Sequence, residues 1–174
     1  IIMPIETNLE DQLNKFKEQY YQENKKNTFF KTSQKNDCAE KVVQHFSIEQ
    51  LLQNSIYVNQ NALFFDYPII KTFIHPNNYH LVITHIDTLI ELMVNKYETF
   101  TIVVNMKSFT VTAAQRYMEL IKNFCSKYLQ NDLFIKRIQT IYVHNSPSVI
   151  NVIRKMVYPF VKSNVSEKVI FMKV

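Results

Sequence analysis

Glycine is absent from this sequence of 174 residues, although average usage of about 7% would supply roughly 12 glycines. The absence excludes the Walker phosphate loop, the dinucleotide-binding loop G-x-G-x-x-G and the nucleophile elbow G-x-S-x-G. Each of these motifs needs glycine, either for a positive φ angle or for a close approach of the backbone to a ligand. Three common kinds of nucleotide-binding and hydrolytic site are therefore excluded.

Arginine is also scarce in this sequence. Only Arg116, Arg137 and Arg154 are present against 17 lysines, and the net charge is +5. Because arginine is best suited to bidentate contacts with bases and phosphates, its scarcity disfavours nucleic acid as a partner. A lysine-rich surface fits either an anionic membrane surface or simple solvation. The abundance of Asn, Lys, Ile, Tyr and Phe is typical of an AT-rich genome, such as that of a protist or a large DNA virus.

Long apolar runs are also missing. No stretch approaches the roughly 18–20 apolar residues of a membrane span, and no signal peptide is recognisable. Cys38 and Cys125 lie in helical patterns and are expected to be reduced core thiols. We therefore expect a cytoplasmic or peripheral membrane protein. The sequence opens with Ile1-Ile2-Met3 rather than with Met, which leaves open whether it is a fragment.

The hydrophobic pattern divides the chain into a helical amino-terminal section, residues 1–54, and an α/β domain, residues 55–174. The 47% hydrophobic content is enough for one substantial core. In the first section three capping patterns predict helix starts. These are Thr7-x-x-Glu10, Asp37-x-x-Glu40 and Ser47-x-x-Gln50.

The second section alternates strands with helices. It opens with a hairpin around Asn59-Gln60-Asn61, and residues 69–74 are predicted as an edge strand because Pro68 precedes them. Continuous apolar runs, typical of strands buried on both faces, predict three central, neighbouring, parallel strands at 100–105, 137–144 and 168–173. Amphipathic patterns predict flanking helices at 79–97 and 110–130. The predicted fold class is α/β, with a mixed, mainly parallel sheet flanked by helices.

The residues that could carry chemistry form no recognisable catalytic or metal motif. His75, His80 and His85 are spaced by five residues, which turns them off a shared helix face. No H-E-x-x-H pattern or cysteine pair accompanies them, so we predict no metal site. His144 and Ser146 are too close in sequence for a Ser-His-acid triad, and Ser146 before a proline is typical of a helix N-cap. We predict no catalytic residue, no cofactor and no enzymatic activity.

The most informative pattern closes the chain. A strand leads through Ile141-Tyr142-Val143-His144 into Asn145-Ser146-Pro147, a helix then ends at Tyr158-Pro159-Phe160, and the last strand opens with Lys168-Val169-Ile170-Phe171. Asn-x-Pro after a strand, Pro-Phe after a helix and Lys-Ile or Lys-Val opening a strand occur in this order in one family. Over residues 62–174 the chain resembles that family, CRAL-TRIO, which includes phosphatidylinositol-transfer proteins and retinal- and tocopherol-binding proteins.

This resemblance implies a lipid pocket. In the CRAL-TRIO family the helix after Asn-x-Pro is a gate that lies across the sheet, and here it would be helix 148–160. The residues expected to contact a lipid or other hydrophobic small molecule are Ile150, Ile153, Val157 and Phe160. Lys168 matches a lysine that recognises phosphoinositides in the transfer proteins. The matching acidic position is Lys136 here, which points to a lipid other than phosphatidylinositol.

Two alternatives remain open on the same fold. The compact BCH-type relatives are as close in length, and several of them are modules that bind proteins. The chain could therefore be a protein-interaction module with a filled pocket, or a virion or scaffold component without a ligand. An anionic membrane surface is a further expected partner if Lys155, Lys162 and Lys168 lie near the pocket mouth.

Overall fold

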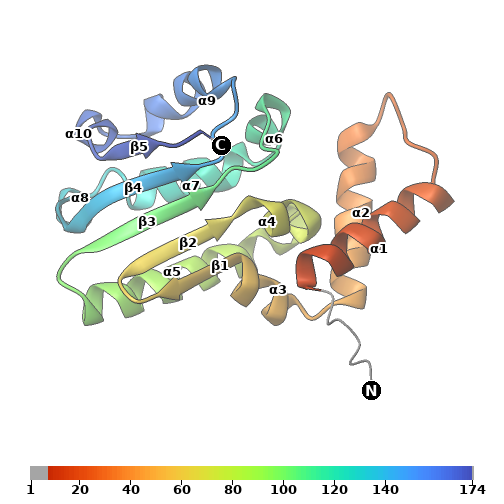
Figure 1. Ribbon diagram of the computed structural model, residues 1–174, viewed down its shortest axis with the longest axis horizontal. Helices are drawn as coiled ribbons and strands as arrows, with labels where there is room; N and C mark the ends of the chain where they lie inside the picture. The colour runs from red at the N-terminus through yellow and green to blue at the C-terminus, as the bar shows by residue number, and fades with distance from the viewer. Residues whose placement is uncertain (1–7, 174) are drawn as a thin grey trace.

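A five-stranded mixed sheet forms the centre of the molecule (Figure 1). The computed structural model describes residues 8–173. Strand order follows chain order, with β1 and β2 antiparallel and every later neighbouring pair parallel. The strands are β1 (Ile56–Asn59), β2 (Ala62–Asp66), β3 (Phe100–Asn105), β4 (Ile138–His144) and β5 (Val169–Phe171). The predicted α/β class with a mainly parallel sheet is confirmed.

The first two strands form the predicted hairpin, in which Asn59 pairs with Ala62. The turn residue Gln60 has φ 53°, in the left-handed region that glycine adopts most readily. Because this chain has no glycine, other residues must adopt that conformation. Among the described residues they are Gln60, Ser108 and Asn145.

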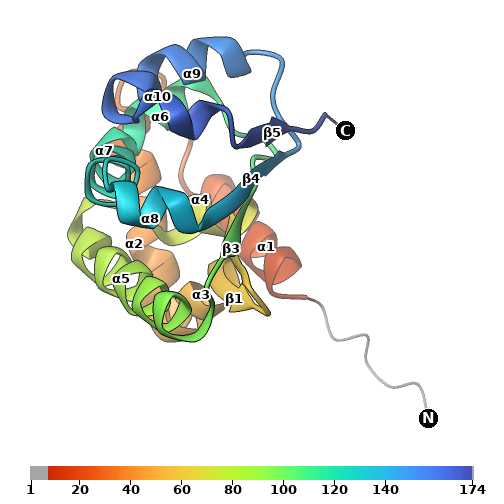
Figure 2. The same ribbon diagram turned by 90° about the vertical axis from the view of Figure 1, so that its left-hand side faces the viewer.

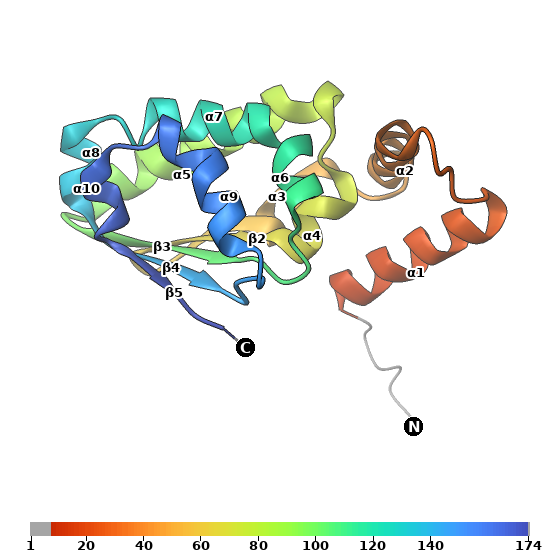
Figure 3. The same cartoon turned by 90° about the horizontal axis from the view of Figure 1, so that it is seen from above.

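All parallel connections cross on the same face of the sheet. The strand order from β2 to β5 follows the chain, and parallel crossovers are right-handed, so every connecting helix is directed to one face. Figures 2 and 3 show these helices together on that face. The connections contain α4 (Tyr67–Phe73), η1 (Pro76–Asn78), α5 (Tyr79–Lys96), α6 (Val111–Arg116), α7 (Met118–Lys127), α8 (Asp132–Arg137), α9 (Ile150–Val157), η2 (Tyr158–Phe160) and α10 (Ser163–Ser166).

The opposite face of the sheet carries an apolar row. The row is in register across all five strands and consists of Tyr57, Phe64, Val103, Tyr142 and Ile170. The Tyr57 and Phe64 rings stack with 5.1 Å between their centroids, and Ile170 is 46% exposed. In Figure 3 the helices of residues 8–173 lie either on the other side of the sheet or, like the first helix, beyond the strand ends.

The amino-terminal helices lie beyond the carboxyl ends of the parallel strands (Figure 1). They are α1 (Leu9–Glu23), α2 (Lys31–His45) and α3 (Ile48–Ser55). Leu13 of α1 and Val42 of α2 are fully buried in the same core as Phe100 of the sheet. The helical section is therefore packed onto the α/β section. Over residues 8–173, no helix is both long and apolar enough to cross a membrane.

The strand predicted at 69–74 is wrong, because this segment forms α4 and its C-cap. Pro68 lies in the first turn of the helix, where a backbone N–H has no partner to lose. The Thr72 hydroxyl donates to the Ile69 carbonyl at 2.7 Å, and Phe73 is fully buried. A short apolar run fits a buried helix as well as a strand, which is why the pattern misled.

Other boundaries also differ from the predictions. The helix predicted at 110–130 is broken at Tyr117 into α6 and α7, and α8 and α10 were not predicted. Helix α2 begins at Lys31 rather than at Asp37. Thr7 lies outside the described residues, and Asn8 caps α1 by accepting the Asp11 N–H at 2.8 Å.

Two further predictions concern helix α3 and the last strand. Ser47 caps α3 as predicted and accepts the Gln50 N–H at 3.4 Å. The last three strands are parallel neighbours as predicted. In the described residues, however, β5 pairs with β4 alone and is an edge strand, not a central one.

Candidate functional site

An apolar cavity of about 350 Å³ lies between the helix-covered face of the sheet and helices α4, α7 and α9. Residues from distant parts of the sequence meet in its wall. The sheet contributes Phe65, Ile102, Val104, Ile141, Val143, Val169 and Phe171, and the helices contribute Tyr67, Ile70, Leu120, Ile121, Phe124, Cys125, Ile150, Ile153, Arg154 and Val157 among others. The cavity is thus roofed by the segment that follows Asn145-Ser146-Pro147.

Helix α9 forms the roof because its two sides differ in polarity. Ile153 faces inward and is 4% exposed, whereas the next residue toward the amino end, Val152, is 49% exposed. The helix begins at Ile150, later than predicted, and Ser146 is not its N-cap. The Ser146 hydroxyl instead donates to the Val143 carbonyl at 3.2 Å, so the N-cap prediction is wrong. The helix ends as expected near Pro159, which lies in η2.

The predicted ligand-contact residues fall into two groups. Ile150, Ile153 and Val157 are brought together in the cavity wall. Phe160 is not part of that wall, and its ring lies 4.9 Å from the Lys122 ammonium. Lys168 is also outside the wall, where its ammonium donates to the Ile138 carbonyl at 2.6 Å. Their roles in binding remain predictions.

The three lysines expected near the pocket mouth are placed differently from one another. Lys155 is exposed on the outer side of α9. Lys162 forms an ion pair with Asp132 at 2.8 Å, and Lys168 is engaged by a backbone carbonyl. Of these three lysines, Lys155 alone is exposed and has no carboxylate partner in the described structure.

The cavity wall is almost without charge. Burial raises the pKa of Tyr67 to about 12 and that of Cys125 to about 11, and it also raises the pKa of Tyr117. These groups are consequently neutral at physiological pH. Apolar contact and shape, rather than ionic bonds, must dominate binding over most of this wall.

Arg154 is the one charged residue in that wall among residues 8–173. Its Nε donates to the Tyr158 hydroxyl at 2.5 Å, and its guanidinium carbon lies 5.1 Å from the Tyr158 ring centroid and 4.9 Å from that of Phe171. No carboxylate of the described chain pairs with it. The wall therefore offers a cation held by aromatic rings and open to an anionic group.

The polar residues at the carboxyl ends of the strands form a hydrogen-bonded chain. Asn145 donates to Asn105 and Asn105 donates to Asp66, each at 2.8 Å. Burial raises the pKa of Asp66, although the hydrogen bond from Asn105 opposes the shift. In the described part of the chain, no three His, Cys, Asp or Glu side chains gather as a possible metal site. These amides hold the strand ends together.

Sequence patterns missed the contributions of α4 and α7 to the cavity. Ile70 lies in the segment that was predicted as a strand, Tyr67 lies just before it, and Leu120 and Phe124 were assigned only to a flanking helix. The broad apolar stripe of residues 113–128 was the available signal. A stripe of that kind indicates burial without indicating whether a core or a cavity faces it.

The comparisons with known proteins agree with this geometry. The CRAL/TRIO domain family matches residues 71–174, which is more than half of the chain, so the chain belongs to the CRAL/TRIO domain family. Proteins of this family bind lipids or hydrophobic small molecules and are generally transfer proteins rather than enzymes. No curated protein matches the sequence.

Solved structures show the same fold. Twenty-one of their chains match this one. The crystal structure of Sfh5 is similar, with a TM-score of 0.57, 13% sequence identity and coverage of 92% of this chain. The match covers only 66% of the Sfh5 chain, and at this identity it supports the fold alone.

Proposed function

We propose that this chain binds one hydrophobic molecule, a lipid or a lipid-like compound, in the cavity beneath α9. The observation that carries the proposal is an apolar cavity in the position where this family covers its ligand with a helix. Pockets for small ligands usually measure about 300–1,000 Å³. At about 350 Å³ this one is near the lower end, which favours a single acyl chain or a compact ring system over a phospholipid with two chains.

The apolar wall of the cavity also supports a bound ligand on energetic grounds. The pocket is partly open, so its apolar wall meets water when no ligand is bound, and apolar surface exposed to water costs about 25 cal/mol for each Å². A ligand would contribute about 0.8 kcal/mol for each CH₂ group that it buries. The filled state is therefore expected to be more stable than the empty one.

Arg154 narrows the chemistry of the proposed ligand. Because it is the charged residue of the wall, an amphiphile with a carboxylate or similar anionic end would place that end beside the guanidinium and its tail in the cavity. Lys168 is engaged elsewhere and does not add to this end of the cavity. We expect a fatty acid or another anionic single-chain amphiphile to bind more tightly than its neutral ester.

Native mass spectrometry of the purified protein tests the proposal. We expect a mass above that of the chain alone, which denaturing spectrometry removes and organic extraction recovers as a hydrophobic compound. Purified protein stripped of that compound should then bind a fluorescent fatty acid with one site for each chain. A protein that carries nothing and takes up no hydrophobic probe would refute ligand binding.

The alternative function is a protein-interaction module on the same fold. The in-register row from Tyr57 to Ile170 on the uncovered face of the sheet favours it, because exposed apolar patches often mark interaction sites. Substitution of Tyr142 by Ser would weaken partner binding in this case and leave uptake of the fatty acid probe unchanged. The two functions are thus separated by one variant and two assays.

A further inference from the structure

Four cations converge on a second, smaller pocket that lies among α1, α2, α4 and α6. Lys17, Lys35, Lys71 and Arg116 come from these four helices in turn and line a pocket of about 180 Å³. Its other lining residues include the hydroxyl groups of Ser108 and Thr110, but no Asp or Glu. Such convergence of like charges needs an explanation, because lysines normally spread over a surface.

These four charges are not neutralised by the described chain. The Lys71 ammonium donates to the Ser108 hydroxyl at 2.7 Å, and the Arg116 Nη2 donates to the Asn36 amide oxygen at 3.2 Å. The Arg116 Nε is buried without a hydrogen-bond partner. The ion pairs of residues 8–173 involve other lysines. A buried guanidinium N–H without a partner is costly and is normally satisfied by a bound group.

Several of these cations lie close enough to repel one another. Burial lowers the pKa of Lys35, and the neighbouring Arg116 and Lys17 lower it further. Burial and Lys17 likewise lower the pKa of Lys71, while Glu10 acts weakly in the opposite direction. A bound anion would oppose both effects, because an opposite charge nearby favours the charged form of a lysine.

We propose that this pocket binds a phosphate group, either of a soluble phosphate or of a lipid headgroup. Arginine and lysine together suit phosphate, because the guanidinium fork binds two oxygens and the ammonium groups supply point charges. The hydroxyls of Ser108 and Thr110 add uncharged partners. The small volume excludes a large ligand. Tyr67 lies in the walls of both pockets, so this pocket is adjacent to the apolar cavity.

Calorimetric titration with inorganic phosphate and pyrophosphate tests the soluble form. We expect saturable binding, tighter for pyrophosphate, that falls by about tenfold or more for each pocket lysine removed. The test variant is Lys17→Gln with Lys71→Gln, because glutamine removes the charge and keeps a polar end, at a length one bond shorter than lysine. The control variant is Lys15→Gln with Lys136→Gln, which removes the same charge from exposed positions outside the pocket.

Vesicle binding tests the lipid form. Vesicles of phosphatidic acid and of phosphatidylserine are matched in surface charge, and we expect a preference for phosphatidic acid that the test variant loses and the control variant keeps. Competition between the fatty acid probe and phosphatidic acid would show that the lipid form rests on the proposed function of the apolar cavity. Binding of both together would show that it does not. Lys71→Gln alone, checked by circular dichroism, serves if the double variant unfolds. Equal losses in test and control variants, or no binding of any phosphate, would overturn the proposal.

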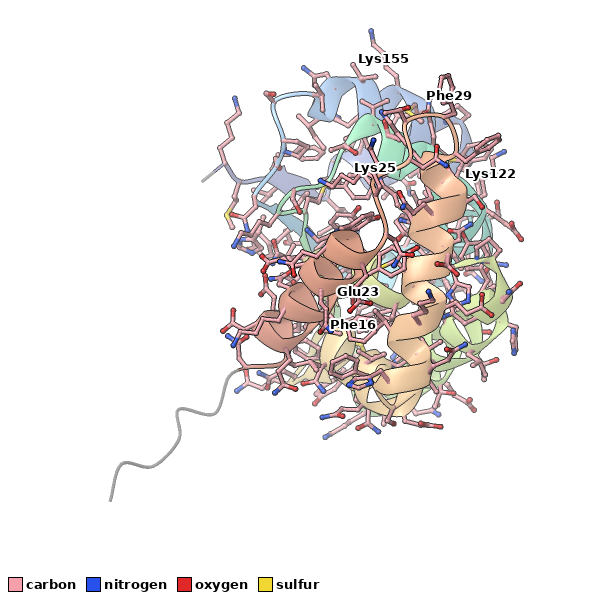
Figure 4. All side chains as sticks on the ribbon, turned by 90° about the vertical axis from the view of Figure 1, so that its right-hand side faces the viewer. Phe16, Glu23, Lys25, Phe29, Lys122 and Lys155 are labelled. Carbon is pink, nitrogen blue, oxygen red and sulfur yellow. The ribbon has the colours of Figure 1, made fainter. Side chains whose placement is uncertain are left out.

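A second, independent feature is the loop between α1 and α2. Phe29 is 91% exposed and Phe30 is 69% exposed, and in Figure 4 Phe29 projects from the loop on which Lys25 also lies. The loop is held in shape rather than frayed. The Asn27 side chain accepts the N–H groups of both phenylalanines at 2.9 Å, and Gln34 donates to the Lys25 carbonyl at 2.9 Å.

We infer that this loop inserts its two phenylalanines into an anionic membrane surface. Lys25, Lys26 and Lys31 lie within four residues of a phenylalanine and residues 24–36 contain no acidic residue, so the charge beside the apolar tip is complementary to acidic headgroups. Burial of each phenylalanine is worth about tenfold or more in membrane partitioning. The charge pattern favours a bilayer over an apolar protein groove.

Flotation with phosphatidylserine vesicles tests this inference. We expect Phe29→Ser with Phe30→Ser to lower membrane binding by about a hundredfold, and added salt to lower it in the parent. The control is Leu133→Ser, which removes a side chain that is 75% exposed on α8. Membrane binding that survives the double substitution, or is lost equally in the control, would overturn the inference and favour a protein partner for the loop.

Discussion

Replacement of Ile153 by Trp is the sharpest test of the cavity beneath α9. Ile153 is 4% exposed and points into a space of about 350 Å³, so an indole can extend into volume that a ligand would otherwise occupy. We expect the variant to fold and to lose its copurified hydrophobic compound. The measurement pairs native mass spectrometry with thermal unfolding of the same sample.

The change in stability of the Ile153→Trp variant distinguishes a cavity from a filled core. In a dense core the larger side chain would cost about 1–3 kcal/mol of overpacking, which lowers Tm by about 2–12 °C for a chain of this length. In an open cavity no such penalty arises. Loss of a ligand also lowers Tm, because a ligand at a hundred times its Kd raises the free energy of unfolding by about 2.7 kcal/mol. The variant must therefore be compared with parent protein stripped of ligand.

The control is Val152→Trp, one residue earlier on the outer side of the same helix, where the side chain is 49% exposed. It should change neither the bound compound nor Tm. An Ile153→Trp variant that is destabilised relative to stripped parent, when the parent itself carries nothing, would show a packed core. A variant that still carries the compound would show that binding occurs elsewhere.

Three further substitutions test other parts of the structure. Arg154→Gln should weaken binding of an anionic fatty acid probe by about tenfold or more, whereas the neutral methyl ester of that probe should bind as before. Equal effects on both ligands would contradict an ionic contact. Leu13→Ala should cost about 2–5 kcal/mol and keep a single unfolding transition, because α1 shares the main core; two transitions would contradict that. Partial burial alone would raise the pKa of Asp87, but hydrogen bonds from Lys127 and Tyr128 outweigh it and lower the pKa. Asp87→Asn should therefore lower the free energy of unfolding by about 1 kcal/mol at neutral pH. The difference in stability from the parent should vanish as pH falls through the depressed pKa, and denaturant titrations at several pH values measure it.

The chain order of strands and helices was determined by the sequence itself. Continuous apolar runs at 100–105 and 137–144 are typical of parallel strands, and right-handed crossovers then leave little freedom in topology, although helices of the described chain cover only one face of the sheet. This order depends on local periodicity and chain connectivity, which a single sequence displays directly. The segment that covers the cavity was expected only from the family resemblance around Asn145-Ser146-Pro147.

Tertiary structure alone decided where the apolar side of each helix faces a core and where it faces a cavity. Ile153 and Phe160 have the same apolar character in the sequence, yet only Ile153 lines the cavity, whereas the Phe160 ring lies 4.9 Å from the Lys122 ammonium. The four cations of the second pocket are separated by up to a hundred residues, from Lys17 to Arg116, and meet only through packing of four helices. Periodicity records which residues leave water, but the partner that each one meets depends on distances between elements that no local pattern contains.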